Sequence, residues 1–199
     1  MHYDPRHEAH GLPHDPFYSL VVPRPIGWIS SISDKGVVNL APYSFFNAVS
    51  SDPPVVMFAS SGRKDSIRNI EQTGEFTCSL ATWDLRQSMN QSSGRYPPDI
   101  SEPAAIRLEM APSIKVAPPR VKMSPAALEC RYLRTVELVT SDGTPMKDAV
   151  VFGEVVQIHI DDAVITDGHV DLQKIKPIAR LGYMDYARVD TIFEMKRPG

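Results

Sequence analysis

Prolines limit the folds that this chain can adopt. The 199 residues include 18 prolines, several of them paired between apolar segments, as in Pro53-Pro54, Pro97-Pro98 and Pro118-Pro119. Proline interrupts helices and central strands because it lacks an amide hydrogen and its φ is fixed. A chain divided into such short pieces favours a mainly β fold with elaborate connections over a helical bundle.

The apolar runs between these breaks have the length and period of β-strands. Phe76, Cys78 and Leu80 alternate with polar residues, which is the period of a strand with one buried face. Asp142-Gly143 separates two long apolar runs and is typical of a hairpin turn. Asp34-Lys35-Gly36 and Asp167-Gly168 indicate further turns. We expect one or two strands in 18–33 and others at 37–40, 55–59, 75–81, 127–140, 149–160 and 189–195.

Helical signals are few and short. Ile67 and Ile70 lie three residues apart within 64–73, and Gly74 supplies a C-terminal stop. Asp84 is a candidate N-cap for a second helix at 84–92. Shorter helices are expected near 104–110 and within 172–186, and 42–51 is expected to form a turn or a single helical turn. Six or seven strands with two or three short helices predict a largely antiparallel, Greek-key or barrel-like sheet.

Composition narrows the class of protein. The chain has 21 Lys and Arg against 24 Asp and Glu, a net charge of −3, which does not favour a nucleic-acid partner. It has no apolar run of about 20 residues that would span a membrane, and its first 17 residues lack the apolar core of a signal peptide. We therefore expect a cytoplasmic protein with an N-terminal arm at 1–17 and a single domain at 18–199.

Cysteines and histidines do not predict a metal site. Cys78 and Cys130 lie in apolar, strand-like runs, where a free thiol behaves as a small buried hydrophobe. Glycine and prolines interrupt the histidine-rich arm, so its histidines cannot share one helical face, and we expect a solvated arm. The arm histidines are His2, His7, His10 and His14.

The segment SSGRKDS at 60–66 lies between an expected buried strand and an expected helix. The first amides of a helix have no internal partner and attract anions. Ser60, Ser61 and Ser66 offer hydroxyls, and Arg63 and Lys64 add positive charge. These features predict a phosphate site, with an alternative in which the segment is a polar turn that Asp65 or Ser66 caps.

The loop at 44–50 has the composition of a surface for a flat heteroaromatic ring. Phe45 and Phe46 offer aromatic faces, Asn47 offers both a donor and an acceptor, and Ala48 leaves room above the backbone. The alternative is that both phenylalanines belong to the core, which is the usual place for this residue. We expect one of the two to be core.

The order and spacing of many short motifs resemble one family over residues 16–194. The chain is similar to the flavin reductase-like, FMN-binding split-barrel family of the flavoredoxin type. The matching motifs are 23–26 PRPI, Gly36, 39–42 NLAP, 44–47 SFFN, 52–54 DPP, 64–70 KDSIRNI, 74–76 GEF, 124–125 SP, 128–130 LEC, 180–182 RLG and Tyr186.

The resemblance implies a six-stranded antiparallel Greek-key split β-barrel with a few short helices, working as a homodimer that binds FMN near the subunit interface. By position, the 44–50 loop would hold the isoalloxazine ring and 60–66 the phosphate, with Arg24, Arg180 and Tyr183 reaching the site from elsewhere. The full set of candidate flavin-binding residues is Arg24, Ser44, Phe45, Phe46, Asn47, Ala48, Val49, Ser60, Ser61, Arg63, Lys64, Ser66, Arg180 and Tyr183. The chain departs from the family at Ser101-Glu102-Pro103-Ala104, where members often keep a Glu-Phe pair that shapes the substrate side.

The implied activity is hydride transfer from NADH or NADPH to flavin N5 and onward to an acceptor, with the cofactor carrying the chemistry. No catalytic side chain and no metal are expected, and no G-x-S-x-G elbow suggests a hydrolase. Two alternatives stay open: an FMN-binding electron carrier without NAD(P)H activity, and a structural or haem-binding protein of the same architecture.

Overall fold

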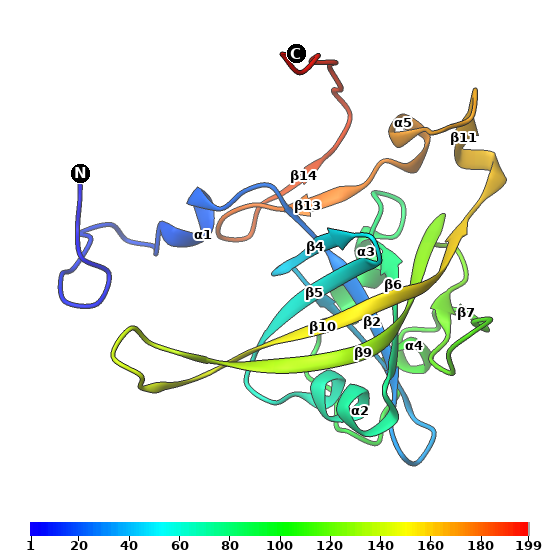
Figure 1. The fold of residues 1–199 in the computed structure, drawn as a ribbon, viewed down its shortest axis with the longest axis horizontal. Coiled ribbons are helices and arrows are strands. Elements are labelled where there is room, and N and C mark those ends of the chain that lie inside the picture. Colours follow the sequence, from blue (N-terminus) through cyan, green and yellow to red (C-terminus); the bar gives the residue numbers. More distant parts are fainter. Residues whose placement is uncertain (199) are drawn as a thin grey trace.

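A seven-stranded antiparallel sheet forms the centre of the protein, a computed structural model that describes residues 1–198 (Figure 1). The strand order is β3-β2-β6-β9-β10-β5-β4, and every neighbouring pair is antiparallel. The strands are β2 Gly27–Ile32, β3 Val38–Tyr43, β4 Phe46–Ser51, β5 Pro54–Ser61, β6 Glu75–Leu80, β9 Ala126–Val139 and β10 Pro145–Ile160. The mainly β fold and its antiparallel hairpins are as the sequence predicts.

The two edge strands of this sheet are consecutive in the chain. Only Ser44 and Phe45 separate the end of β3 from the start of β4, which allows at most about 11 Å between them. Seven strands in a flat sheet would place those edges about 29 Å apart, at about 4.8 Å per strand. The sheet therefore curls until its edges meet at this corner, and one face becomes an enclosed core.

Prolines occupy the positions in this sheet that tolerate them. Pro42 lies in the edge strand β3, and Pro54 and Pro145 are the first residues of β5 and β10. Because proline cannot donate to a strand ladder, it is confined to edges, strand starts and bulges. The prolines thus set where strands begin without breaking the ladders between them.

Helix α2 (Asp65–Thr73) closes one side of the curled sheet. Ile67 and Ile70 are fully buried and join Ile29, Phe58 and Phe76 in the main core cluster. The helix ends at Gly74, whose φ of 73° is left-handed and whose amide bonds to the carbonyl of Ile70. The helix is therefore held where the isoleucine spacing and the glycine predict.

A second core cluster lies beneath short elements that follow β6. Trp28, Leu40, Met89 and Ile178 are its main members, and Trp28 donates from Nε1 to Ser92 Oγ at 2.9 Å. These contacts hold α3 against the sheet. The short elements are α3 Arg86–Gln91, α4 Glu102–Ala105, β7 Met110–Ala111 and β8 Arg120–Val121.

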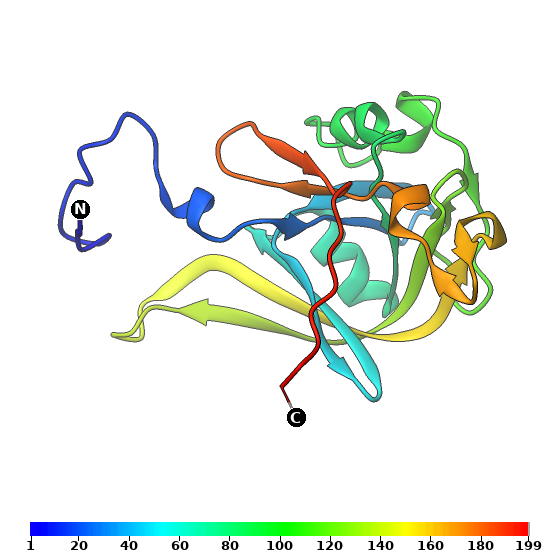
Figure 2. The same ribbon diagram turned by 90° about the horizontal axis from the view of Figure 1, so that it is seen from above.

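Segments near the two ends of the chain pair in a small separate sheet of order β1-β13-β14. Its strands are β1 Arg24–Pro25, β13 Ile178–Arg180 and β14 Tyr186–Arg188, and α1 Phe17–Leu20 precedes it. The remaining elements are η1 Asp162–Val164, β11 Ile165–Thr166, β12 His169–Val170 and α5 Leu172–Ile175. Residues 1–16 lead away from the body (Figures 1 and 2), and Arg6 pairs with Asp142 at 3.0 Å.

The β9–β10 hairpin projects far beyond the rest of the sheet, as Figure 2 shows. Its outer part exposes Leu133, Val136, Val139 and Met146. Apolar side chains gathered on a projecting hairpin are unusual for a free surface and are typical of interaction sites.

Four local predictions were wrong. Segment 42–51 contributes the strand β4, because pairing with β5 outweighs its turn-like composition. Leu85, not Asp84, is the N-cap residue of α3, since a turn from Trp83 to Arg86 precedes the helix. The helix expected at 104–110 is replaced by α4, which begins and ends earlier in the chain. The strand expected at 189–195 does not form among the described residues, and the last strand is β14.

The sheet contains seven strands where the resemblance implied six. The two cysteines are buried and free on β6 and β9, and burial raises the pKa of Cys78 to about 12. Within residues 1–198, no helix is long and apolar enough to cross a bilayer.

Candidate functional site

A cavity of about 690 Å³ opens where the corner between β3 and β4 meets the start of α2. A third wall comes from the connection between α3 and α4, so segments far apart in sequence share the site. The lining residues are Asn39, Ala41, Pro42, Tyr43, Ser44, Phe45, Ala59, Ser60, Ser61, Lys64, Asp65, Ser66, Arg68, Ser92, Ser93, Gly94, Arg95, Tyr96, Pro98 and Glu102.

The N-terminus of α2 lies at this cavity without a side-chain cap. Lys64 is the N-cap residue in an extended conformation, and no side chain bonds to the first-turn amides. The alternative in which Asp65 or Ser66 caps the helix is therefore wrong. Uncapped amides at a helix start carry partial positive charge and favour an anion.

A buried polar network fixes the direction of α2. Asn39 donates to Ser66 Oγ at 2.9 Å and to Ser31 Oγ at 3.3 Å, and Asn69 donates to the same Ser31 oxygen at 3.2 Å. These bonds join α2 to β2 and β3 at buried positions. The network holds the first turn of the helix at the cavity independently of any ligand.

Tyr43 presents a hydroxyl that has no hydrogen-bond partner among the described residues. The residue is 7% exposed and lies on the cavity wall between the apolar core and the cavity. Burial raises the pKa of Tyr43 against a smaller opposite effect of the nearby Ser66 and Ser60 hydroxyls, neither of which forms a hydrogen bond of normal geometry with it, so the group stays a neutral donor. Leaving a buried hydroxyl unpaired costs about 1–3 kcal/mol, which a ligand acceptor would recover.

Charged side chains give the cavity a mixed but mostly positive wall. Lys64 and Arg95 have no ion-pair partner within residues 1–198, whereas Arg68 pairs with Asp65. Glu102 is buried and accepts a hydrogen bond from the Leu40 amide at 2.9 Å. Burial raises the pKa of Glu102, which favours its neutral form and reduces repulsion of an anion.

Six of the fourteen candidate residues line the cavity. They are Ser44, Phe45, Ser60, Ser61, Lys64 and Ser66. The structure therefore brings the expected phosphate segment and the start of the expected ring loop into one space. The rest of that loop, 46–49, lies on β4 outside the cavity lining.

The two phenylalanines of the loop have different environments. Phe46 packs on the main core and covers Gly27, where an added Cβ would meet its ring at 2.4 Å. Phe45 lines the cavity and is 39% exposed. The expectation that one of the two is core is confirmed.

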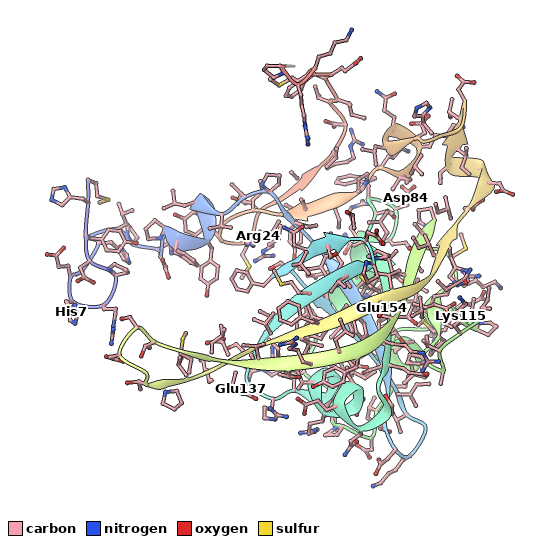
Figure 3. The ribbon with its side chains drawn as sticks, viewed as in Figure 1. His7, Arg24, Asp84, Lys115, Glu137 and Glu154 are labelled. Atoms are coloured by element: carbon pink, nitrogen blue, oxygen red, sulfur yellow. The ribbon has the colours of Figure 1, made fainter. Side chains whose placement is uncertain are left out.

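Two arginines expected at the site do not line the cavity, although the guanidinium carbon of Arg24 lies 5.6 Å from the centroid of the Phe45 ring. Arg24 is buried, and its guanidinium donates to the carbonyls of Tyr18, Val21 and Leu181 at 2.6–2.8 Å. Figure 3 shows it between α1 and the sheet, where it ties the N-terminal segment to the segment after β13. Arg63 pairs with Glu71 and Glu137 and does not line the cavity.

Arg180 and Tyr183 also lie outside the cavity lining. Arg180 stacks over Tyr186, with 4.5 Å from its guanidinium carbon to the ring centroid, and it donates to the Tyr183 carbonyl. The Tyr183 ring lies 5.5 Å from that of His14, so it faces the N-terminal arm.

Sequence reasoning missed much of the cavity wall. Tyr43 falls in 42–51, which the sequence predicts as a turn or a single helical turn, and Arg95, Tyr96 and Glu102 lie in a proline-rich region without periodicity. The family motif at 39–42 and the departure from the family at 101–104 were the signals that pointed toward parts of this wall. The wall from 92–102 carries no local pattern because distant contacts position it.

The donors present fit a phosphorylated planar ligand such as a flavin mononucleotide. Uncapped amides, an unpartnered tyrosine hydroxyl and unpaired Lys64 and Arg95 suit a phosphate, and Phe45 offers an aromatic face. The volume lies within the range of about 300–1,000 Å³ that is usual for ligand sites.

Comparisons with solved structures define the class of protein. Nitrilotriacetate monooxygenase component B from Bacillus cereus is 28% identical, with 98% of each chain covered and a TM-score of 0.89. The 2-nitrobenzoate 2-nitroreductase of Pseudomonas fluorescens is 26% identical over 100% of this chain and 96% of that one, with a TM-score of 0.86. A Shewanella frigidimarina protein described as a flavin reductase with a split barrel domain is 25% identical over the whole of both chains, with a TM-score of 0.83.

These similarities identify a flavin reductase-like, split-barrel fold. Residues 18–179 match the family described as flavin reductase like domain. The chain belongs to this family, as its motifs indicated.

Proposed function

We propose that this protein is an FMN-binding oxidoreductase of the flavin reductase type, with NADH or NADPH as the hydride donor. The observation that carries the proposal is the uncapped start of α2 beside the unpartnered hydroxyl of Tyr43 in one large cavity. Both features leave donors unsatisfied that a phosphate would satisfy. Family membership and the monooxygenase component and nitroreductase similarities support a redox role.

Each wall of the cavity has a part in this proposal. Ser60, Ser61, Ser66 and Lys64 would bind the phosphate together with the α2 amides. Phe45 and the backbone at 44–45 would border the ring. FMN, when bound, supplies a ring whose N5 accepts hydride and whose reduced form delivers electrons to an acceptor.

The protein's own contribution is to bind, orient and exclude water. Tyr43 stays protonated because burial raises its pKa, so it remains a donor throughout the neutral pH range. Burial also raises the pKa of Glu102, which shifts that carboxyl toward its neutral form and lessens its repulsion of the phosphate. No proton transfer from a side chain is required for hydride transfer.

Anaerobic mixing of the FMN-loaded protein with NADH or NADPH tests this function. We expect the flavin absorbance to bleach with one or both donors. Bleaching that also occurs at the same rate with free FMN alone would contradict a role for the protein. Persistence of the absorbance with both donors would contradict the reductase activity.

A second candidate is an FMN-binding electron carrier without NAD(P)H activity. The open cavity, lined by exposed Phe45 and half-buried Tyr96, would let a partner's redox centre approach as readily as a nicotinamide. Reduction of the bound flavin by a reductase protein, and never by NAD(P)H, would favour the carrier.

We also propose that the protein works as a homodimer. The projecting β9–β10 hairpin exposes Leu133, Val136, Val139 and Met146, with Val139 59% exposed. Burying such a face against a second copy would remove this apolar surface from water.

A further inference from the structure

A second cavity, of about 270 Å³, lies on the other side of α3 and shares no lining residue with the large one. It opens between α3 and the β13–β14 hairpin, next to the chain at Asp84 that Figure 3 labels. Its lining residues are Trp83, Arg86, Gln87, Met89, Asn90, Ile178, Tyr186 and Ala187. The proposed flavin site makes no use of any of them.

The floor of this cavity is apolar and rigid. Met89 and Ile178 are almost fully buried members of the second core cluster, and Ala187 adds a small side chain from β14. The amide of Trp83 bonds to the carbonyl of Lys176 at 2.9 Å, which holds the start of α3 to the strand segment opposite. This bond joins the two walls of the cavity at one end, so the cavity is a fixed feature of the fold.

The rim of the cavity is polar, and part of its hydrogen-bonding capacity is unused. Residues 86, 87 and 90 lie one turn or less apart on α3, so their side chains share the face that borders the cavity. The side-chain amides of Gln87 and Asn90 make no hydrogen bond within residues 1–198. A deep apolar floor with a few convergent polar groups is the usual composition of a small-molecule site.

Arg86 supplies the charge at this rim. Its guanidinium carbon lies over the Trp83 ring, 3.9 Å from the centroid, and the group donates one hydrogen bond to the Trp83 carbonyl. No carboxylate pairs with Arg86 in the part of the chain that the structure describes. Stacking holds the guanidinium plane still while leaving other N–H groups at its edge, and such a fork matches a carboxylate in two parallel hydrogen bonds.

The neighbouring arginines reinforce the preference for an anion. Arg188 approaches the other side of this cluster, 5.3 Å from the Trp83 centroid, but it is paired with Asp190 at 2.8 Å. Arg180 stacks on Tyr186 and is not paired with an acid among residues 1–198. Two unpaired guanidinium groups near a narrow apolar cavity favour a ligand with one negative end and a flat apolar body.

We propose that this cavity binds a small aromatic carboxylate, with the ring on Met89, Ile178 and Ala187 and the carboxylate on Arg86. This ligand site is separate from the flavin site, and it stands whether or not the protein has reductase activity.

Calorimetric titration of the purified protein with benzoate tests the proposal, with its flavin content kept constant. We expect benzoate to bind and both benzamide and acetate to bind at least about tenfold more weakly, because the first lacks the charge and the second the apolar body. Arg86→Gln should weaken benzoate binding by a similar factor. Arg134→Gln, a change at an exposed arginine on β9, is the matched control and should leave binding unchanged.

Ala187→Leu fills part of the cavity and leaves Arg86 itself unchanged, so it tests the location even where Arg86→Gln disturbs the Trp83 stack. We expect this variant, with unchanged circular dichroism, to lose benzoate binding. Absence of binding to the wild-type protein, or equal binding by the Ala187→Leu variant, would overturn the proposal. Equal affinity for benzoate and benzamide would overturn the role of Arg86.

Discussion

Single residues in this protein are best understood from whether their polar atoms are already satisfied. Arg24 and Arg63 are both charged, but both already bond to other groups of the chain. The Arg24 guanidinium bonds to backbone carbonyls, and the Arg63 guanidinium pairs with two glutamates. Tyr43 has only a hydroxyl, but that hydroxyl has no partner in the described chain and borders the large cavity. Availability of a donor, more than its charge, therefore indicates which residues meet a ligand.

Tyr43→Phe tests this view directly. We expect FMN affinity to fall by about tenfold, since a hydrogen bond contributes about 0.5–1.5 kcal/mol and more when the acceptor is charged. The free energy of unfolding without FMN should stay equal or rise, because the variant removes an unpaired buried hydroxyl. Fluorescence titration and urea unfolding measure the two quantities. Tyr132→Phe on β9, which loses a bond to Thr135, is the control, and equal FMN affinity in wild type and Tyr43→Phe would contradict the role.

The irregular segments between the strands are held in place by a few buried side chains. Glu129 on β9 is 0% exposed and accepts hydrogen bonds from the amides of Ile114, Lys115 and Val116 and contacts His159 on β10. Burial by itself raises the pKa of Glu129, but the His159 contact and the backbone amides together outweigh it and lower the pKa. One carboxylate thus fastens the irregular 114–116 segment to the sheet.

Glu129→Gln should lower the free energy of unfolding by about 1.5–3 kcal/mol near neutral pH, the value of hydrogen bonds to a charged group. Because the folded-state pKa is lowered, this stabilisation is present above the usual value of 4.5 and is lost as pH falls through the folded-state pKa. The difference between wild type and variant in urea unfolding should therefore shrink in acid. Glu109→Gln, which breaks an exposed pair with Lys122, should leave the free energy of unfolding nearly unchanged.

The contact between β2 and β4 sets how tightly the sheet curls. Gly27→Ala would place a Cβ 2.4 Å from the Phe46 ring, and we expect a loss of about 1–3 kcal/mol. Combining it with Phe46→Leu should cost less than the sum of the two single changes, because the smaller side chain relieves the clash. Strictly additive losses in denaturant unfolding would show that Phe46 does not limit this position.

The molecule as a whole combines a closed core with an open projecting hairpin. The curled sheet buries its inner face, whereas the outer part of β9 and β10 projects from the body (Figure 2) and leaves apolar side chains exposed. A second copy is the occupant that we propose for this face.

Sedimentation analysis tests the proposed dimer. We expect the wild type to sediment as a dimer and the Leu133→Asp, Val139→Asp double variant as a monomer, because burying two carboxylates opposes association. Met123→Asp alters an equally apolar, 70% exposed residue away from the hairpin and should remain dimeric. A monomeric wild type at micromolar concentration would contradict the proposal.

Local sequence signals determined the elements that depend on neighbours in the chain. The isoleucine spacing and Gly74 predicted α2, Asp142-Gly143 predicted the long hairpin, and 60–66 predicted an anion-favouring helix start. Periodicity and turn chemistry suffice there because both report contacts within a few residues of one another.

Only the tertiary structure decided which of those features share one space. The two-residue corner between the edge strands makes the sheet curl, and the curl brings Tyr43, Lys64 and Arg95 to a common cavity. The same packing diverts Arg24 and Arg63 to other partners and places Phe46 in the core and Phe45 at the cavity. Sequence patterns show which face of an element is buried, but the long-range pairing of strands determines what that face meets.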